Sequence, residues 1–275
     1  MSLFDDMVAG IATTAGGMRE NAVHEAMQQV ALAGLARGGF FEKAAFYGGT
    51  CLHFFHGLRR FSEDLDFSLL GPDPDFRFED YFDAVREEFH LAGRDVEIQA
   101  KRKVGPSDIE CAFLKEASTV YDIGFTSERR VKAKLEVDVS PPLGFKTEMQ
   151  LLMHPVASWI RTFDLPGLYA GKMHAVLFRE WRSRVKGRDW YDLAWYVGRN
   201  AVLDLGHLAA RAADTHPGAD FSTPEALRAA LLRRIGDVDF KAARSDVLPF
   251  IEDPRELDIW SREYFTALAM RVRTE

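Results

Sequence analysis

The chain has 275 residues, of which 47% are hydrophobic and 28% are charged, so it is long enough for one large domain or two smaller ones with a packed core. Its formal net charge of −7 excludes a strongly basic nucleic-acid-binding protein at the level of the whole chain, and its two cysteines, Cys51 and Cys111, are too few for a disulfide framework. We find neither a signal-peptide pattern nor an apolar run approaching the ~20 residues that span a bilayer, and therefore expect a cytoplasmic protein with no membrane partner.

The first half of the chain mixes predicted helices and strands. A helix is expected from about residue 21 to residue 37, where apolar residues recur at helical spacing before a glycine pair. A short buried strand is expected next, then a helix-compatible run, a second strand and an amphipathic helix, at 44–47, 51–58, 65–70 and 78–91. Residues 131–140 alternate between apolar and polar and predict a half-buried strand. Residues 94–127 are less regular and are interpreted as two further strands.

Beyond about residue 155 the strand patterns give way to helical ones. Helices are predicted at 167–181, 189–200, 204–214, 223–235 and 255–272. We therefore predict an α+β fold with a boundary near residues 141–160. A mixed sheet with helices is expected in residues 1–150, followed by a C-terminal helical bundle in residues 151–275.

Paired carboxylates mark the second predicted strand. Asp64 and Asp66 lie two residues apart, so strand alternation places both side chains on one face of the sheet. Two carboxylates this close repel each other unless a cation joins them, and Mg²⁺ prefers such hard oxygen ligands together with substrate phosphates. The strand at 131–140 offers a third carboxylate from Asp138 or Glu136. Three carboxylates can hold two metal ions for phosphoryl chemistry, and the third can accept the proton of an attacking hydroxyl.

A glycine turn comes directly before this acidic strand. Gly48 and Gly49 let the backbone approach a triphosphate closely, and the Thr50 hydroxyl together with the first amides of the following helix can bind phosphate oxygens. Each signal alone has an ordinary explanation, because a lone Asp-x-Asp is usually solvated and a lone Gly-Gly-Thr is usually a turn. Their order of strand, turn, helix and acidic strand favours a nucleotide site.

Two cations and two acids follow in the helical half. Lys172 and Arg179 fall on one face of a predicted helix, where they can offset the charge of a triphosphate. An isolated pair of this kind is more often a solvated surface. Asp189 and Asp192 begin the next helix, where acids are favoured by the helix dipole. A role for Asp189 in orienting Lys172 or a metal ion is an equally weighted alternative.

These segments resemble the nucleotidyltransferase superfamily of polymerase β-like enzymes. The wider stretch 46–68, with Arg60 and Ser62 before the acidic pair, is similar to one branch, the AbiEii/AbiGii toxin family with the related mycobacterial MenT toxins. That family has a Lys-x-x-Ala-x-x-x-Arg motif and then Arg-Asp-x-x-Asp, which match residues 172–179 and 188–192. Thr50 stands where serine is often found. The matched motifs lie between about residues 40 and 200.

The resemblance implies a nucleotidyltransferase acting on an NTP with Mg²⁺ or Mn²⁺, as the toxin of a toxin–antitoxin pair, with a cognate antitoxin protein as partner. It implies that the helical domain contributes Lys172 and Asp189 to the site. The residues expected to be catalytic are Asp64, Asp66, Asp138, Lys172 and Asp189, of which Asp64, Asp66 and Asp138 bind metal. The residues expected to bind the nucleotide are Gly48, Gly49, Thr50, Arg60, Ser62, Lys172 and Arg179.

The acceptor is indicated by a basic segment. Residues 179–188 are rich in Arg and Lys within an acidic protein, which favours a polyanionic acceptor such as RNA. A solvated loop explains the segment almost as well. Some relatives modify the acceptor end of tRNA, so the resemblance favours tRNA. A protein side chain or a small-molecule hydroxyl is an alternative acceptor. A catalytically silent nucleotide-binding module is disfavoured because all the expected acids are present.

Overall fold

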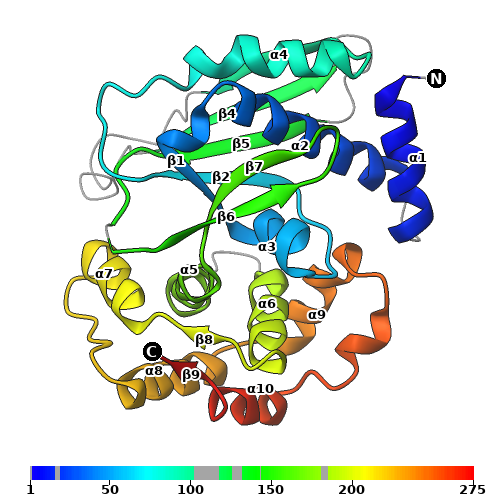
Figure 1. Cartoon of the computed structure of the whole chain (residues 1–275). Helices are drawn as coiled ribbons and strands as arrows, with labels where there is room; N and C mark the ends of the chain where they lie inside the picture. Colours follow the sequence, from blue (N-terminus) through cyan, green and yellow to red (C-terminus); the bar gives the residue numbers. More distant parts are fainter. Residues whose placement is uncertain (1, 16–18, 102–117, 126–131, 143, 181–184) are drawn as a thin grey trace. The chain divides into compact units, whose positions relative to one another are not determined.

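The computed structural model describes residues 2–15, 19–101, 118–125, 132–142, 144–180 and 185–275. The chain divides into two compact units (Figure 1). The first unit consists of Met1–Gly57, Phe61–Pro141 and Thr147–Thr162, and the second of Leu58–Arg60, Pro142–Lys146 and Phe163–Glu275. None of the helices in the described ranges is long and apolar enough to cross a membrane.

The first unit is built on a seven-stranded mixed sheet. Its order is β3-β4-β5-β2-β1-β7-β6. The central strand β2 pairs antiparallel with β1 and parallel with β5. The strands are β1 (Ala44–Tyr47), β2 (Asp64–Leu69), β3 (Val96–Lys101), β4 (Ser118–Phe125), β5 (Lys132–Asp138), β6 (Thr147–Leu152) and β7 (Ser158–Phe163).

Helices of the first unit bury apolar faces around this sheet. They are α1 (Leu3–Ala15), α2 (Arg19–Arg37), α3 (Gly48–His56) and α4 (Phe82–Leu91), and α2 packs against both α1 and α4. Gly34 permits the close approach of α2 to α4, because a Cβ there would lie 2.7 Å from the Cα of Val85. The Phe67 ring of β2 lies 5.0 Å from the Phe40 ring and 5.3 Å from the Phe46 ring, measured between centroids. Burying each such ring contributes about 1.5–3 kcal/mol, so the apolar face of β2 anchors its acidic face.

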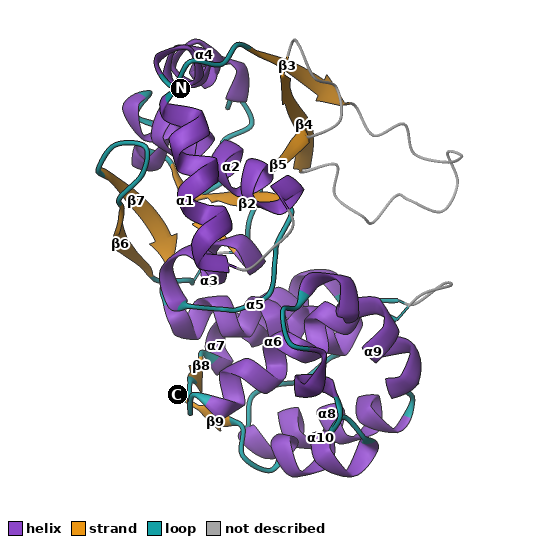
Figure 2. Ribbon diagram, turned by 90° about the vertical axis from the view of Figure 1, so that its right-hand side faces the viewer, coloured by secondary structure: helices purple, strands orange, loops and turns teal. Residues whose placement is uncertain are grey.

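The second unit is mostly helical (Figure 2). Its helices are α5 (Leu165–Phe178), α6 (Gly187–Gly198), α7 (Leu205–Thr215), α8 (Pro224–Gly236), α9 (Phe240–Val247) and α10 (Arg262–Ala269). A two-stranded sheet joins β8 (Val202–Leu203) to β9 (Arg273–Thr274). Side chains of Asp164, Asp204 and Thr223 accept hydrogen bonds from the first turns of α5, α7 and α8, which satisfies amides that have no intrahelical acceptor.

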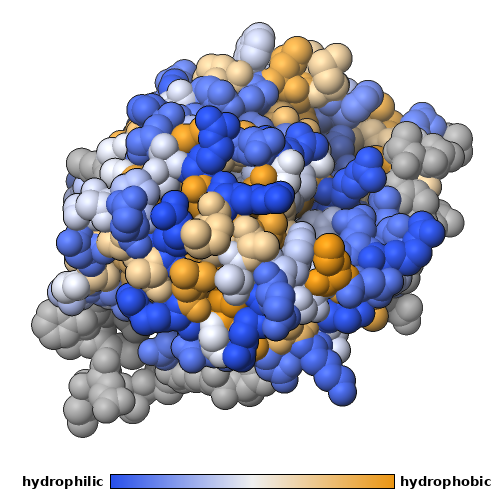
Figure 3. Space-filling model, turned by 90° about the horizontal axis from the view of Figure 1, so that it is seen from below, coloured by the Kyte–Doolittle hydropathy of each residue, from blue (hydrophilic) through white to orange (hydrophobic). Residues whose placement is uncertain are grey.

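The surface of the molecule mixes residue types. Figure 3 shows hydrophilic residues over much of one face, with hydrophobic residues scattered among them. Scattered exposed apolar residues are normal for a folded protein.

The predicted α+β fold class is confirmed, with strands β1, β2 and β5 within a residue or two of their expected bounds. Strands β3 and β4 match the two strands expected in 94–127, although the intervening residues, with Cys111, lie outside the described ranges. Strands β6 and β7 were not predicted. They extend the first unit to Thr162, so a boundary at residue 150 falls within β6.

Helices α1 and α9 were also missed, and the long helix expected at 255–272 is wrong. In its place are a 3₁₀ turn at Pro254–Leu257 and α10. The Ser261 side chain accepts a hydrogen bond from the Tyr264 amide, 3.1 Å away, and this cap starts a new helix.

Candidate functional site

The acidic strand β2 presents its carboxylates on one face of the sheet. Leu65, Phe67 and Leu69 are buried, whereas Asp64 and Asp66 are half-buried on the other face. The alternation expected from the sequence is therefore present. The apolar side chains hold the strand in the core, which leaves the two carboxylates on the opposite face of the sheet.

Strand β5 lies beside β2 with its own polar face in register. The paired residues are Asp64 with Lys134, Asp66 with Glu136 and Ser68 with Asp138. Glu136 is thus directly across from Asp66, whereas Asp138 is one pair further along and accepts a hydrogen bond of 3.0 Å from the Ser140 amide. Of the two alternatives left open by the sequence, the register favours Glu136 as the carboxylate that joins the Asp64–Asp66 pair.

A lysine on the same face was given no role from the sequence. The Lys134 Nζ donates a hydrogen bond of 2.8 Å to the Glu136 carboxylate. Although burial opposes its charge, this bond and the carboxylates of Asp64 and Asp66 raise the pKa of Lys134. Lys134 therefore supplies positive charge among three acids that would otherwise repel one another. Its place in the alternating strand was the signal that could have identified it.

The glycine turn brings the start of α3 against the acidic face. Gly48 has a φ of 84°, a left-handed conformation that favours glycine. A Cβ at Gly48 would lie 2.5 Å from the Asp66 Oδ2, so any larger residue would collide with the carboxylate. The Thr50 hydroxyl is fully buried and donates to the Asp64 carbonyl. This hydroxyl fixes α3 to β2, and the first amides of α3 are the groups suited to phosphate.

Ser62 is nearly buried just before β2. Its carbonyl accepts a hydrogen bond of 3.0 Å from the Gln28 side chain of α2. The segment that leads into the acidic strand is therefore held by α2, and Ser62 contributes to that placement.

The acidic face carries carboxylates of the kind that bind metal ions. Within the part of the chain that the structure describes, no three histidine, cysteine, aspartate or glutamate side chains are grouped closely enough to hold a metal ion. Asp64 and Asp66 nevertheless offer hard carboxylate oxygens on one open face. Mg²⁺ is commonly bound by one or two carboxylates together with substrate phosphates and water, so the donor set fits an ion that arrives with a nucleotide.

A second group of predicted residues forms a charge network inside the helical unit. The Lys172 Nζ of α5 lies 2.9 Å from the Asp189 carboxylate and 2.8 Å from the Asp192 carboxylate of α6. Arg179 lies 3.3 Å from the other Asp189 oxygen, and its side chain is 43% exposed. The orientation of Lys172 by Asp189, left open by the sequence, is thus present, and Asp192 shares it.

Arg60 completes this network from a loop far away in the sequence. Its Nε and Nη2 donate bonds of 2.6 and 2.7 Å to the two Asp192 oxygens. Such a bidentate pair is geometrically specific. Because Arg60 is 2% exposed, its guanidinium is committed to Asp192, and the geometry favours a positioning role over contact with a nucleotide.

The protonation states of the network follow from these contacts. Although burial opposes charge, Asp189 and Asp192 raise the pKa of Lys172, and Asp192 likewise raises the pKa of Arg60. The same cations lower the pKa of Asp192 against the effect of burial. The two carboxylates therefore favour the ammonium form of Lys172 and hold it in position.

The basic segment 179–188 is only partly described. Residues 181–184, including Arg182 and Arg184, lie outside the described ranges. The Arg188 guanidinium lies 4.2 Å from the centre of the Phe250 ring. The half-buried Arg188 thus lies beside an aromatic side chain.

A comparison with known protein families identifies the family of this chain. The model of the family described as "Nucleotidyl transferase AbiEii toxin, Type IV TA system" matches residues 30–268. The chain belongs to the AbiEii family. It is therefore a nucleotidyltransferase of a toxin family, and membership implies an NTP substrate and a cognate antitoxin.

Solved structures share the fold of this AbiEii protein. JHP933 from Helicobacter pylori is 16% identical, with a TM-score of 0.53 over 92% of this chain and 91% of that one. MenT4, a nucleotidyltransferase toxin from Mycobacterium tuberculosis H37Rv, is 19% identical, with a TM-score of 0.55 over 96% of this chain and 90% of that one. A search of curated proteins gave no match. At these identities the likeness concerns the fold.

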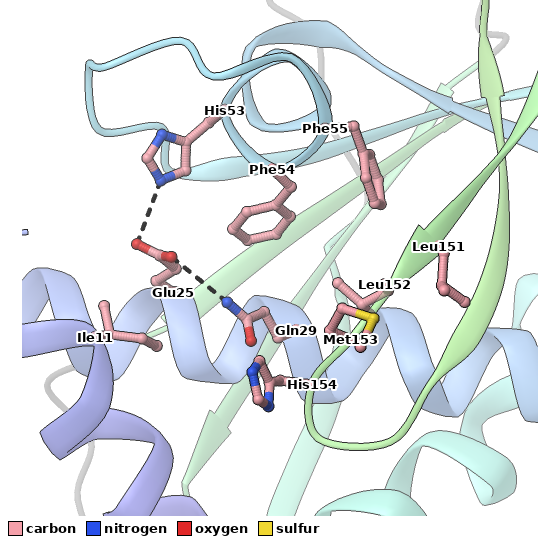
Figure 4. A pocket seen from close by; sticks show the side chains of 10 residues that line it. All are labelled: Ile11, Glu25, Gln29, His53, Phe54, Phe55, Leu151, Leu152, Met153 and His154. Atoms are coloured by element: carbon pink, nitrogen blue, oxygen red, sulfur yellow. Dashed lines mark hydrogen bonds and ion pairs between the residues drawn. The ribbon is translucent and has the colours of Figure 1, made fainter. Parts of the chain in front are cut away.

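The first unit also has a pocket away from the acidic face. Its volume is about 370 Å³, and its walls come from α1, α2, α3 and β6 (Figure 4). Glu25 lies 3.3 Å from His53, beside Phe54 and Met153. None of the residues predicted for the nucleotide site lines this pocket, so we assign it no part in nucleotide binding.

Proposed function

We propose that this AbiEii protein transfers an NMP group from an NTP to an acceptor hydroxyl in a Mg²⁺-dependent reaction. The observation that carries the proposal is the register of β2 and β5, which aligns Asp64, Asp66 and Glu136 on one open face. The glycine turn at Gly48 adjoins the same face. Acids and phosphate-binding amides are thus supplied by one unit.

The reaction is an in-line displacement at the α-phosphorus. The acceptor oxygen forms a bond to phosphorus, the α–β phosphoanhydride bond breaks, and pyrophosphate leaves. A carboxylate on β5, Glu136 or Asp138, accepts the hydroxyl proton. Asp64 and Asp66 would hold Mg²⁺, which shields the charge on the phosphates when it is bound.

Charge on the triphosphate is offset by amides and cations. The backbone at Gly48, Gly49 and Thr50 supplies amides at the start of α3. Lys172, held in place by Asp189 and Asp192, and the exposed Arg179 are the cations that the family motif assigns to the nucleotide. Arg60 is assigned to positioning Asp192, and Ser62 to holding the entry to β2.

The proposed acceptor is RNA, and tRNA in particular. Support comes from basic residues at the start of α6 and directly before it, such as Arg188 and Lys186, in a chain whose net charge is −7. A basic segment in an otherwise acidic protein attracts a polyanion. We propose that the reaction takes place in the cytoplasm, where NTPs, Mg²⁺ and RNA are all present.

The test uses labelled NTPs with purified tRNA, a protein extract and Mg²⁺. Asp64→Ala should lose transfer by several orders of magnitude while its melting temperature stays within a few degrees of wild type. Asp75→Ala, which removes an exposed carboxylate outside the site, is the matched control. A folded Asp64→Ala variant with unchanged transfer would disprove the site, and labelling of protein alone would disprove the RNA acceptor.

The third carboxylate is tested by a pair of variants. If Glu136 is the carboxylate that joins Asp64 and Asp66, the Glu136→Gln variant should lose transfer by about 10²-fold or more, in the range of a lost general base. The Asp138→Asn variant should lose much less activity. The opposite order would assign the role to Asp138.

A further inference from the structure

A pocket of about 750 Å³ lies in the helical unit, at α9 and the segment before α10. Three cationic side chains line it, those of Lys241, Arg244 and Arg255, and one carboxylate, that of Asp258. The protein as a whole carries a net charge of −7. The excess of cations at this pocket is therefore a local feature.

Helix α9 holds two of these cations in place. Lys241, Arg244 and Ser245 follow the spacing of one helix face, while Phe240 and Val247 are buried in the core. The pocket floor includes Leu257 and Trp260, which are buried as well. The cations thus project from a rigid, apolar base.

Within the described ranges, two of the three cations have carboxylate partners, and Lys241 is the exception. Arg244 lies 3.3 Å from Asp258, with 40% and 72% of their side chains exposed, and Arg255 pairs with Asp253 outside the lining. Exposed pairs of this kind are weak. Among the described residues, no ion pair involves the Lys241 ammonium. We infer that this pocket binds the phosphate backbone of an RNA.

The position of the pocket favours a polyanion over a free nucleotide. Helix α9 packs directly on the start of α6, where the Gly187 amide donates a bond of 2.8 Å to the Asp246 carboxylate. Helix α6 also carries Asp189, which holds Lys172. Arg188 lies over Phe250, two residues beyond the pocket residue Leu248. Cationic side chains therefore lie on α6 as well as on α9, which suits a ligand with several phosphates.

This inference rests on the proposed RNA acceptor and assigns it a second contact. The experiment measures binding of a labelled tRNA to the full chain by fluorescence anisotropy across a salt series. Loss of one phosphate contact lowers the slope of log K against log salt concentration by about 0.7–0.9. At 0.1 M salt this corresponds to roughly six-fold weaker binding. We expect this loss for Lys241→Glu. Lys241→Arg should retain the wild-type affinity.

The matched control is Arg271→Glu, which makes the same change in net charge at an exposed site beyond the end of α10. It should alter binding by less than two-fold, roughly the effect of overall charge under salt screening. Equal losses for Lys241→Glu and Arg271→Glu would overturn the pocket assignment. A polyglutamate competitor that displaces RNA as well as unlabelled tRNA does would also overturn it, in favour of an acidic protein segment.

Transfer to tRNA is measured in parallel. If wild type labels tRNA but Lys241→Glu binds tRNA normally, the pocket assignment fails and the proposed function stands. If binding depends on Lys241 and no tRNA is labelled under any condition, the pocket assignment is supported and the acceptor proposed above fails.

Discussion

Replacing Asp192 by alanine is the perturbation that most directly tests the charge network of the helical unit. Asp192 is fully buried and contacts two cations, Arg60 and Lys172. The substitution removes one negative charge and leaves both cations in the interior. Only Asp189 then remains to balance Lys172.

The expected magnitude follows from this loss of balance. Removing one partner of a buried ion pair costs about 3–5 kcal/mol, because the remaining charge is desolvated without compensation. Asp192 serves two cations, so the upper part of that range is expected. Since folded proteins are stable by only about 5–15 kcal/mol, the variant should be close to unfolding at 37 °C. A neutral replacement of the whole pair, Arg60→Met with Asp192→Leu, should recover much of the loss.

Urea unfolding followed by tryptophan fluorescence measures this effect. Trp190 and Trp260 are buried in the helical unit, so the signal reports mainly on that unit. Glu275→Gln is the control, because Glu275 forms an exposed pair of 3.5 Å with Lys146 in the same unit. It should cost no more than about 1 kcal/mol. If Asp192→Ala costs no more than this control, the network does not stabilise the fold.

Three further predictions concern other parts of the chain. Gly187→Ala should lower the melting temperature of the helical unit by several degrees in a thermal scan, because a Cβ there would lie 1.9 Å from the carbonyl oxygen of Ala243. Gly48→Ala should abolish transfer in the labelled-NTP assay with a smaller change in stability, since the added Cβ collides with the Asp66 carboxylate. Burial lowers the pKa of His174 and His207 from 6.5 to about 4. Between about pH 6.5 and pH 4 the unfolded chain therefore binds more protons than the folded one, and the free energy of unfolding falls with acidification by at most about 2.7 kcal/mol per pH unit; unfolding curves that coincide at pH 7 and pH 5 would contradict this.

The sheet could be predicted where its strands are short and flanked by clear breaks. Strand β2 has an apolar face and an acidic face in alternation, and β5 has the same pattern. Strand β7 also alternates, with Trp159 exposed and Ile160 buried, but it begins within residues 141–160, where a domain boundary was expected. Its place in the sheet depends on pairing with β1, where Phe46 lies opposite Thr162. Pairing between residues so far apart in the chain has no local signature.

The same limit applies to the candidate site. The acidic pair and the glycine turn could be predicted because each depends on a few consecutive residues. The pairing of Arg60 with Asp192 spans 132 positions, so the sequence alone could not show that this arginine is occupied. The choice between Glu136 and Asp138 depends on the register of two strands, which alternation leaves undetermined.

Lys134 and Lys172 illustrate two ways in which this chain manages charge. Lys134 is half-exposed and bonded to Glu136, so it balances the acidic face from a position that solvent can reach. Lys172 is held by two carboxylates in a buried network that also contains Arg60. Its ammonium is therefore fixed in position before any ligand binds, which avoids the entropy of ordering a flexible side chain. Arginine at position 172 would not reproduce these contacts, because its planar fork is larger and less compact than an ammonium group.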